Sequence, residues 1–156
     1  MDLKQLYQDI ILEHGKSPRN FGKGEGYNHN AKGYNPLCGD KVHVYLKVNS
    51  GKKVEGVTFE GEGCAISLAS ASIMTELVKG KSFDETKDIM NAFLNMIKNT
   101  SEIRSNHLDD DKKTKLMSLS GVKQFPMRVK CATLSWHTLI SAIEGKKEEI
   151  NTETID

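Results

Sequence analysis

Residues 42–60 contain the pattern that most constrains the fold of this chain. Apolar side chains at Val42, Val44 and Leu46 recur at every second position, which is the period of a strand with one buried face. The stretch "NSGKK" then supplies turn residues, and a second strand is predicted at about 54–60. Together the two strands predict an antiparallel hairpin.

Helical periodicity is found on both sides of this hairpin. In "SFDE" the residues Ser82 and Glu85 fit a capping box, which marks the start of a helix. Pro126 suits the first turn of a last helix, and Gly80 suits the left-handed position after a helix end. The predicted helices cover residues 2–14, 66–77, 82–98 and 126–143.

Three stretches lack such periodicity. Residues 15–39 hold six glycines and are predicted to form a long loop. Residues 99–124 are polar, include the surface charge run "LDDDKKTK", and suggest one short helical segment near Leu116. Residues 146–156 are polar and are expected to fray. The predicted fold class is therefore α+β, a small antiparallel β-sheet with helices packed on one face, in a single domain over residues 1–145.

Net charge and hydropathy limit the kinds of partner and the cellular location that we expect for this chain. The chain has 156 residues and a formal net charge of +1, which gives no electrostatic basis for binding nucleic acid or an anionic membrane. No apolar run approaches the roughly 20 residues of a membrane-spanning helix, and acidic residues in the first helix are unlike a secretory or transit peptide. We therefore expect a cytoplasmic protein, in which the three cysteines would be buried, catalytic or metal-binding rather than paired in disulfides.

The cysteines share one property, which is that each is predicted near the end of a strand or helix. Cys38 precedes a strand, Cys64 lies between a strand and a helix, and Cys131 lies in the early turns of the last helix. If these ends converge, three thiolates and the carboxylate of Asp40 would supply the four ligands of a tetrahedral Zn²⁺ site. Asp40 and Cys38 point to the same side in extended backbone, and Gly39 between them imposes no steric obstacle.

An alternative is that each cysteine is a small buried hydrophobe, which is common for free cysteine. The local sequences argue against it, because "PLCGD" and "GEGC" are glycine-flanked and Cys131 has Arg128 and Lys130 as neighbours, which favour a thiolate. The spacing between the cysteines is long, however, and by itself it leaves both interpretations open.

Four stretches resemble a known family. The sequences "NPLCGDKVHVYLKV", "VTFEGEGCAISLASASIMTELVKGKS" and "FPMRVKCATLSWHTL", with "LYQDIILEHGKSPRNFG" before them, resemble the U-type proteins of iron–sulfur cluster biogenesis (the IscU/NifU-like family) over residues 2–143. In the IscU-type scaffolds a histidine precedes the third cysteine, whereas this chain has Lys130 there. Lys130, Arg128 and the polar insertion at 99–124 resemble instead the SufU branch of zinc-dependent sulfurtransferases.

The resemblance implies a function and a set of roles. It implies that Cys38, Asp40, Cys64 and Cys131 bind Zn²⁺, and that sulfur is accepted as a persulfide from a PLP-dependent cysteine desulfurase of the SufS type. A histidine of the desulfurase would replace Cys38 on zinc, so that the freed Cys38 accepts the sulfur, while Arg128 offsets the negative charge of the site. The sulfur would then pass to a downstream iron–sulfur scaffold complex.

Two other functions stay open on the sequence. One is an iron–sulfur cluster assembly scaffold that uses the same four ligands, because thiolates bind zinc and iron alike. The other is an adaptor module whose zinc is purely structural.

Overall fold

The computed structural model of the chain describes residues 2–99, 102–146 and 148–154. Its strands are β1 (His29–Asn35), β2 (Asp40–Val48), β3 (Val54–Glu62) and β4 (Ile150–Asn151). Its helices are α1 (Leu3–Lys16), α2 (Ala65–Val78), α3 (Phe83–Lys98), α4 (Asp110–Met117) and α5 (Pro126–Glu144), with two 3₁₀ helices, η1 (Ser118–Gln124) and η2 (Thr152–Thr154).

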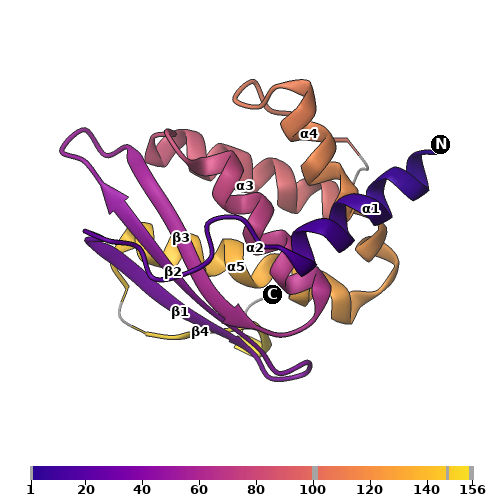
Figure 1. Cartoon of the computed structure of the whole chain (residues 1–156), viewed down its shortest axis with the longest axis horizontal. Coiled ribbons are helices and arrows are strands. Elements are labelled where there is room, and N and C mark those ends of the chain that lie inside the picture. Colours follow the sequence, from indigo (N-terminus) through magenta and orange to yellow (C-terminus); the bar gives the residue numbers. More distant parts are fainter. Residues whose placement is uncertain (1, 100–101, 147, 155–156) are drawn as a thin grey trace.

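The strands within the described residues form one sheet in the order β3-β2-β1-β4. β2 pairs antiparallel with both β1 and β3, and only the short β4 runs parallel to its neighbour β1. α5 packs on β1 and β2, while α2 packs on β3 and on α5, so that the helices gather beside the strands (Figure 1). The structure therefore confirms a small, mostly antiparallel sheet with helices packed on one face.

The strand β1 corrects the prediction of a continuous loop over residues 15–39. Its buried positions are Ala31, Gly33 and Asn35, which alternate as in any half-buried strand but carry no large apolar side chain. Gly33 is needed there, because a Cβ atom would overlap the Thr138 hydroxyl and lie 2.9 Å from Leu134 Cδ1 of α5. A strand that is buried by a close helix contact needs small residues, and a search for apolar alternation misses it.

The strand β4 corrects the expectation of fraying for residues 150–152. Ile150 and Asn151 pair with Gly33 and Tyr34 of β1, and Thr152, the next residue, is 2 % exposed. Polar composition suggested fraying, but two backbone pairings and a buried hydroxyl hold this segment on the edge of the sheet.

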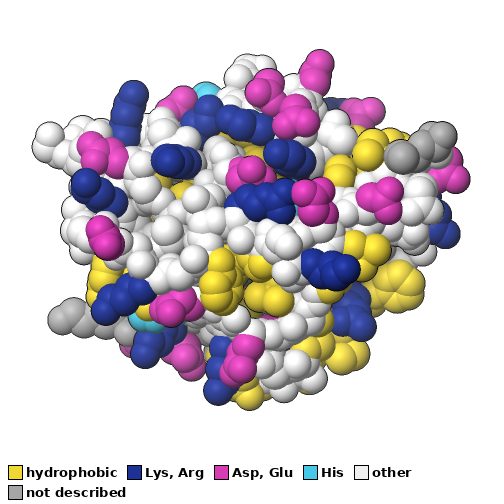
Figure 2. Space-filling model, viewed as in Figure 1, with side chains coloured by type: hydrophobic (Ala, Val, Ile, Leu, Met, Phe, Trp, Pro, Cys, Tyr) yellow, Lys and Arg dark blue, Asp and Glu magenta, His cyan; other side chains and the backbone are white. Residues whose placement is uncertain are grey.

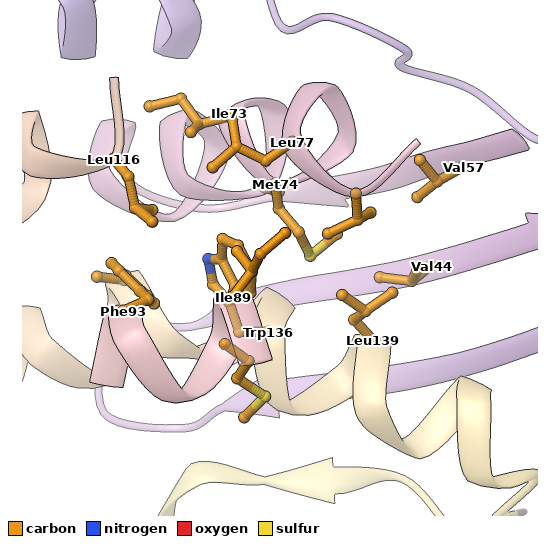
Figure 3. Packing of buried hydrophobic residues seen from close by; sticks show 14 of the residues in the cluster. Val44, Val57, Ile73, Met74, Leu77, Ile89, Phe93, Leu116, Trp136 and Leu139 are labelled. Carbon is orange, nitrogen blue, oxygen red and sulfur yellow. The ribbon is translucent and has the colours of Figure 1, made fainter. Parts of the chain in front are cut away.

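The hydrophobic core lies between the sheet and the helices. Trp136 of α5 is fully buried, and its ring centroid lies 5.0 Å from that of Phe93 of α3. Ile89 and Phe93 project from α3 toward Trp136 in Figure 3. The indole N–H of Trp136 donates a hydrogen bond of 3.2 Å to Ser70 Oγ of α2, so that the polar end of the ring is also satisfied.

The predicted helix ends are confirmed at three places. Ser82 and Glu85 form the capping box at the start of α3, Pro126 occupies the first turn of α5, and Gly80 follows α2 with a φ of 83°. The polar stretch 99–124 is more helical than predicted, since its charge run "LDDDKKTK" lies largely within α4, which is capped by the side chain of Asp109. Among the described helices, none combines the length and hydropathy needed to cross a membrane.

Candidate metal centre

Three connections bring the cysteines to one end of the sheet. Cys38 lies in the turn that joins β1 to β2, and Asp40 is the first residue of β2. Cys64 is the N-cap of α2, directly after β3, and Cys131 lies in the second turn of α5. Figure 1 shows the β1–β2 turn, the link from β3 to α2 and the beginning of α5 at the same end of the molecule. The element ends therefore converge, as the sequence predicted.

Cys38, Asp40 and Cys131 form the tight part of this cluster. One ligand atom from each of them lies within 4.8 Å of the other two, and the Sγ atoms of Cys38 and Cys131 are 3.5 Å apart. Asp40 and Cys131 are both 0 % exposed, whereas Cys38 is half-buried. Two of these three groups are thus fixed in the interior, and the third lies at its surface.

Cys64 joins the cluster through its backbone and through Cys131. Its backbone N–H donates a hydrogen bond of 2.9 Å to Asp40 Oδ1, and its side chain hydrogen-bonds that of Cys131. The preceding Gly63 has a φ of 146°, and a Cβ atom there would overlap the Asp40 carboxylate. Cys64 lies outside the tight group of three, so its role as the fourth ligand stays a prediction.

The thiols and Arg128 are electrostatically coupled. The hydrogen bond from Cys131, with backbone N–H groups of Ser67 and Ile66 at the start of α2, lowers the pKa of Cys64 to about 6. The same interaction with Cys64, together with burial, raises the pKa of Cys131. The electrostatic interaction with Cys64, and then with Cys131, in turn raises the pKa of the Arg128 guanidinium. Without a metal, the negative charge therefore rests on Cys64, beside Arg128.

Asn35 is a member of the site that the sequence analysis missed. This last residue of β1 is fully buried, and its amide Nδ2 donates to Asp40 Oδ2 at 3.2 Å and to Cys131 Sγ at 3.5 Å. The available signal was its place in the motif "NPLCGD", three residues before Cys38. An asparagine next to a proline usually indicates a turn, which hides such a role.

The donor set fits a Zn²⁺ ion. A tetrahedral zinc with Zn–S bonds of about 2.3 Å would hold two sulfur ligands about 3.8 Å apart, close to the 3.5 Å between the Cys38 and Cys131 sulfurs. The hydrogen bonds found for Asp40 among the described residues come from neutral donors. A buried carboxylate needs a charge partner, and a divalent cation bound by Asp40 and the neighbouring thiolates would be one.

Residues 6–132 match the family described as the NifU-like N terminal domain. This match covers most of the chain. The chain therefore belongs to the NifU-like N-terminal domain family.

Curated relatives of two kinds are similar to the chain. It is 39 % identical over 150 residues to the zinc-dependent sulfurtransferase SufU of Bacillus subtilis, covering 95 % of each protein. It is 34 % identical over 142 residues to the iron–sulfur cluster assembly scaffold protein IscU of Streptococcus pyogenes, covering 91 % of this chain and 85 % of the relative.

A solved structure has the same fold. The crystal structure of a putative iron–sulfur cluster assembly scaffold protein for the SUF system from Fervidobacterium islandicum superposes with a TM-score of 0.74 at 34 % identity, covering 89 % of this chain and 97 % of the other.

Proposed function

We propose that this protein is a zinc-dependent sulfurtransferase of iron–sulfur cluster biogenesis, with Cys38, Asp40, Cys64 and Cys131 as metal ligands. The observation that carries the proposal is the asymmetry of the cluster, in which a half-buried Cys38 lies 3.5 Å from a fully buried Cys131. The similarity to a zinc-dependent sulfurtransferase over 95 % of the chain supports the same function.

Cys38 is the proposed sulfur acceptor. Its thiolate attacks the outer sulfur of a persulfide on a donor protein, forming a new S–S bond to Cys38 and breaking the S–S bond of the donor. The donor cysteine leaves as a thiolate, and Cys38 carries the persulfide. Bound Zn²⁺ would keep the cysteines deprotonated and hold them in place. Because Cys38 lies in an exposed turn, an outside sulfur atom can reach it, whereas Cys131 is fully buried.

Arg128 is the proposed charge-balancing residue of this transfer. It lies on the first turn of α5, it is exposed, and its guanidinium interacts with the side chains of Cys64 and Cys131. A cation there stabilises the thiolate ligands and the negative charge that moves between sulfur atoms during transfer.

The proposed sulfur donor is a PLP-dependent cysteine desulfurase of the SufS type. Large apolar side chains flank the site in the sequence, since Leu37 beside Cys38 is 50 % exposed and Met127 beside Arg128 is 52 % exposed. In Figure 2 hydrophobic side chains are visible at the right, where α1 lies, and in the lower centre of this face, with acidic and basic groups interspersed around them. Exposed apolar groups around the site favour docking of a protein donor over a small thiol.

Persulfide transfer to Cys38 is tested with a purified SufS-type desulfurase. Cys38→Ala should reduce stimulation of the desulfurase to background, because the substitution removes the attacking thiolate. Ser50→Ala, in the exposed turn between β2 and β3, is the control and should stimulate normally. Sulfide release in the presence of cysteine and a thiol reductant measures the effect, and normal stimulation by Cys38→Ala would refute the acceptor role.

A second candidate is an assembly scaffold, which is favoured by the 34 % identity to the IscU of Streptococcus pyogenes. The same donor set would then hold a nascent cluster as cargo. Anaerobic purification separates the two functions. A colourless protein with about one zinc per chain supports the transferase, and a brown protein that passes its iron–sulfur cluster to an apoprotein supports the scaffold.

A further inference from the structure

The segment β4–η2 (residues 150–154) reaches the candidate metal centre from the far end of the sequence. Thr152 is 2 % exposed, and its hydroxyl donates a hydrogen bond of 3.0 Å to Asn35 Oδ1. Asn35 is 0 % exposed and its amide group contacts both Asp40 and Cys131. A continuous chain of hydrogen bonds therefore runs from Thr152 through one buried amide to two proposed metal ligands.

The direction of these hydrogen bonds is fixed by chemistry. An ionised carboxylate only accepts hydrogen bonds, so Asn35 must present its NH₂ group to Asp40. Its carbonyl oxygen then faces Thr152, and the Thr152 hydroxyl must be the donor. A flipped amide would place its oxygen against the Asp40 carboxylate, which is repulsive. The Asp40 carboxylate therefore selects the orientation of Asn35 in which two N–H groups point at the site, and the Thr152 hydroxyl holds the amide there by donating to its carbonyl oxygen.

Two further contacts fasten the segment in this position. Its first residues pair with Gly33 and Tyr34, the two residues of β1 that precede Asn35. On its other side, Glu153 forms an ion pair with Lys130, the residue directly before Cys131. Both partners of this pair are about one-third exposed, so the pair contributes little stability by itself. It does link the segment to the turn of α5 that carries Cys131.

We propose that Thr152 is a positioning residue of the metal centre, which acts through Asn35 on Asp40 and Cys131. The proposal rests on the proposed metal site but not on sulfur transfer. Groups that orient metal ligands by hydrogen bonds change metal affinity by roughly 10- to 100-fold when they are removed. The β4–η2 segment thus governs how firmly the metal is held, although it supplies no ligand.

The test compares three variants by the rate at which zinc-loaded protein loses Zn²⁺ to a chromogenic chelator. Thr152→Val keeps the side-chain shape but removes the hydroxyl, and release should accelerate by about 10-fold or more. Thr152→Ser keeps the hydroxyl and should stay within about two-fold of the unmodified protein. Thr154→Val is the matched control, because this exposed hydroxyl in the same segment bonds only to Asn151 O among the described residues.

Stability measurements separate positioning from a structural role. Urea unfolding of the metal-free proteins shows how much Thr152→Val weakens the fold itself by leaving the buried Asn35 carbonyl without a donor. A Thr152→Val protein that is destabilised but releases zinc at the unmodified rate would overturn the proposal. Equal acceleration in Thr154→Val would also overturn it, because that variant leaves Asn35 untouched.

The zinc-release test can fail or succeed independently of the test of sulfur transfer. Failure of the Cys38→Ala test would remove the sulfurtransferase and leave the zinc-release test intact. If the unmodified protein takes up no zinc, the positioning is measured on the metal-free protein by NMR. Exchange of the Asn35 side-chain NH₂ protons with solvent should then accelerate by about 10-fold in Thr152→Val but not in Thr152→Ser. Equal exchange in all variants would refute the proposal.

Discussion

Cys38 and Cys131 lie 3.5 Å apart but in opposite surroundings. Cys131 is fully buried in α5 and receives a hydrogen bond from Asn35, whereas Cys38 lies in an exposed four-residue turn beside Gly39, whose φ is 72°. Asp40 shares the buried surroundings of Cys131. One half of the site is thus built into the fold, and the other half is attached to it by a turn. A ligand can leave such a site on the turn side without disturbing the core.

Cys64 lies between these extremes. It is half-buried and caps α2, so its backbone is fixed by the hydrogen bond to Asp40 while its sulfur stays near the surface. Its lowered pKa and the raised pKa of Cys131 follow the same division, since the thiol nearer to solvent and to backbone N–H groups carries the charge.

The buried half is tested most strongly by Asp40→Ala. This change removes a proposed ligand and leaves the Cys64 N–H and Asn35 Nδ2 without their acceptor, at about 1–3 kcal/mol for each buried donor. Zinc affinity should fall by more than about 100-fold, beyond the range for residues that only orient ligands. Competition with a chelator measures it, with Cys38→Ala as the comparison. If Cys38→Ala weakened zinc binding as much as Asp40→Ala, the two halves would not differ.

The two glycines beside the site test how rigid each half is. In Gly63→Ala the new Cβ atom would overlap the Asp40 carboxylate at a φ that favours glycine, and we expect a loss of about 3 kcal/mol of folding stability. Gly39→Ala is the matched control, because nothing lies within 4 Å of its Cβ position, and it should cost about 1 kcal/mol. Urea unfolding of both variants measures their losses of folding stability. Equal losses would contradict the division of the site into a rigid buried half and a looser half on the turn.

Thiol reactivity of the metal-free protein tests the division of charge. The thiolate is the reactive form, so Cys64, with its pKa lowered to about 6, should react with iodoacetamide at pH 7 and lose reactivity as the pH falls through 6. Cys131, with its raised pKa and full burial, should react at least about 10-fold more slowly than Cys64. Peptide mapping by mass spectrometry follows each residue. A common midpoint above pH 8 would show that the two thiols are equivalent.

Sequence patterns predicted the elements that carry large apolar side chains. β2, β3, α2, α3 and α5 were all identified because burial imposes a period of two or about 3.6 on such residues. β1 was not predicted because its inward positions hold Ala31, Gly33 and Asn35 and so lack large apolar side chains; at Gly33 the closeness of α5 excludes a side chain. β4 was not predicted because two residues are too few to show a period, and its pairing partner lies more than 100 residues away.

The candidate site was predicted in its thiols and carboxylate but not in its supporting contacts. Cys38, Asp40 and Cys131 come together as expected because strand and helix ends meet at one edge of the sheet. Lys130 was singled out as a mark of one family branch, and its contact with Glu153 could not be read from the sequence. Hydrogen bonds and ion pairs between distant residues depend on the completed fold, and no local pattern encodes them.

The hydrogen bond between Asn35 and Thr152 also sets an order of events during synthesis. The two residues are 117 positions apart, so at 5–20 residues per second a ribosome reaches Thr152 roughly 6 to 23 seconds after Asn35. Cys38, Asp40 and Cys64 are all translated early in this interval, and Cys131 follows near its end. Until Thr152 is added, the carbonyl oxygen of the Asn35 amide lacks its hydrogen-bond donor. The site is therefore among the last parts of the molecule to be completed, although most of its proposed ligands are made early.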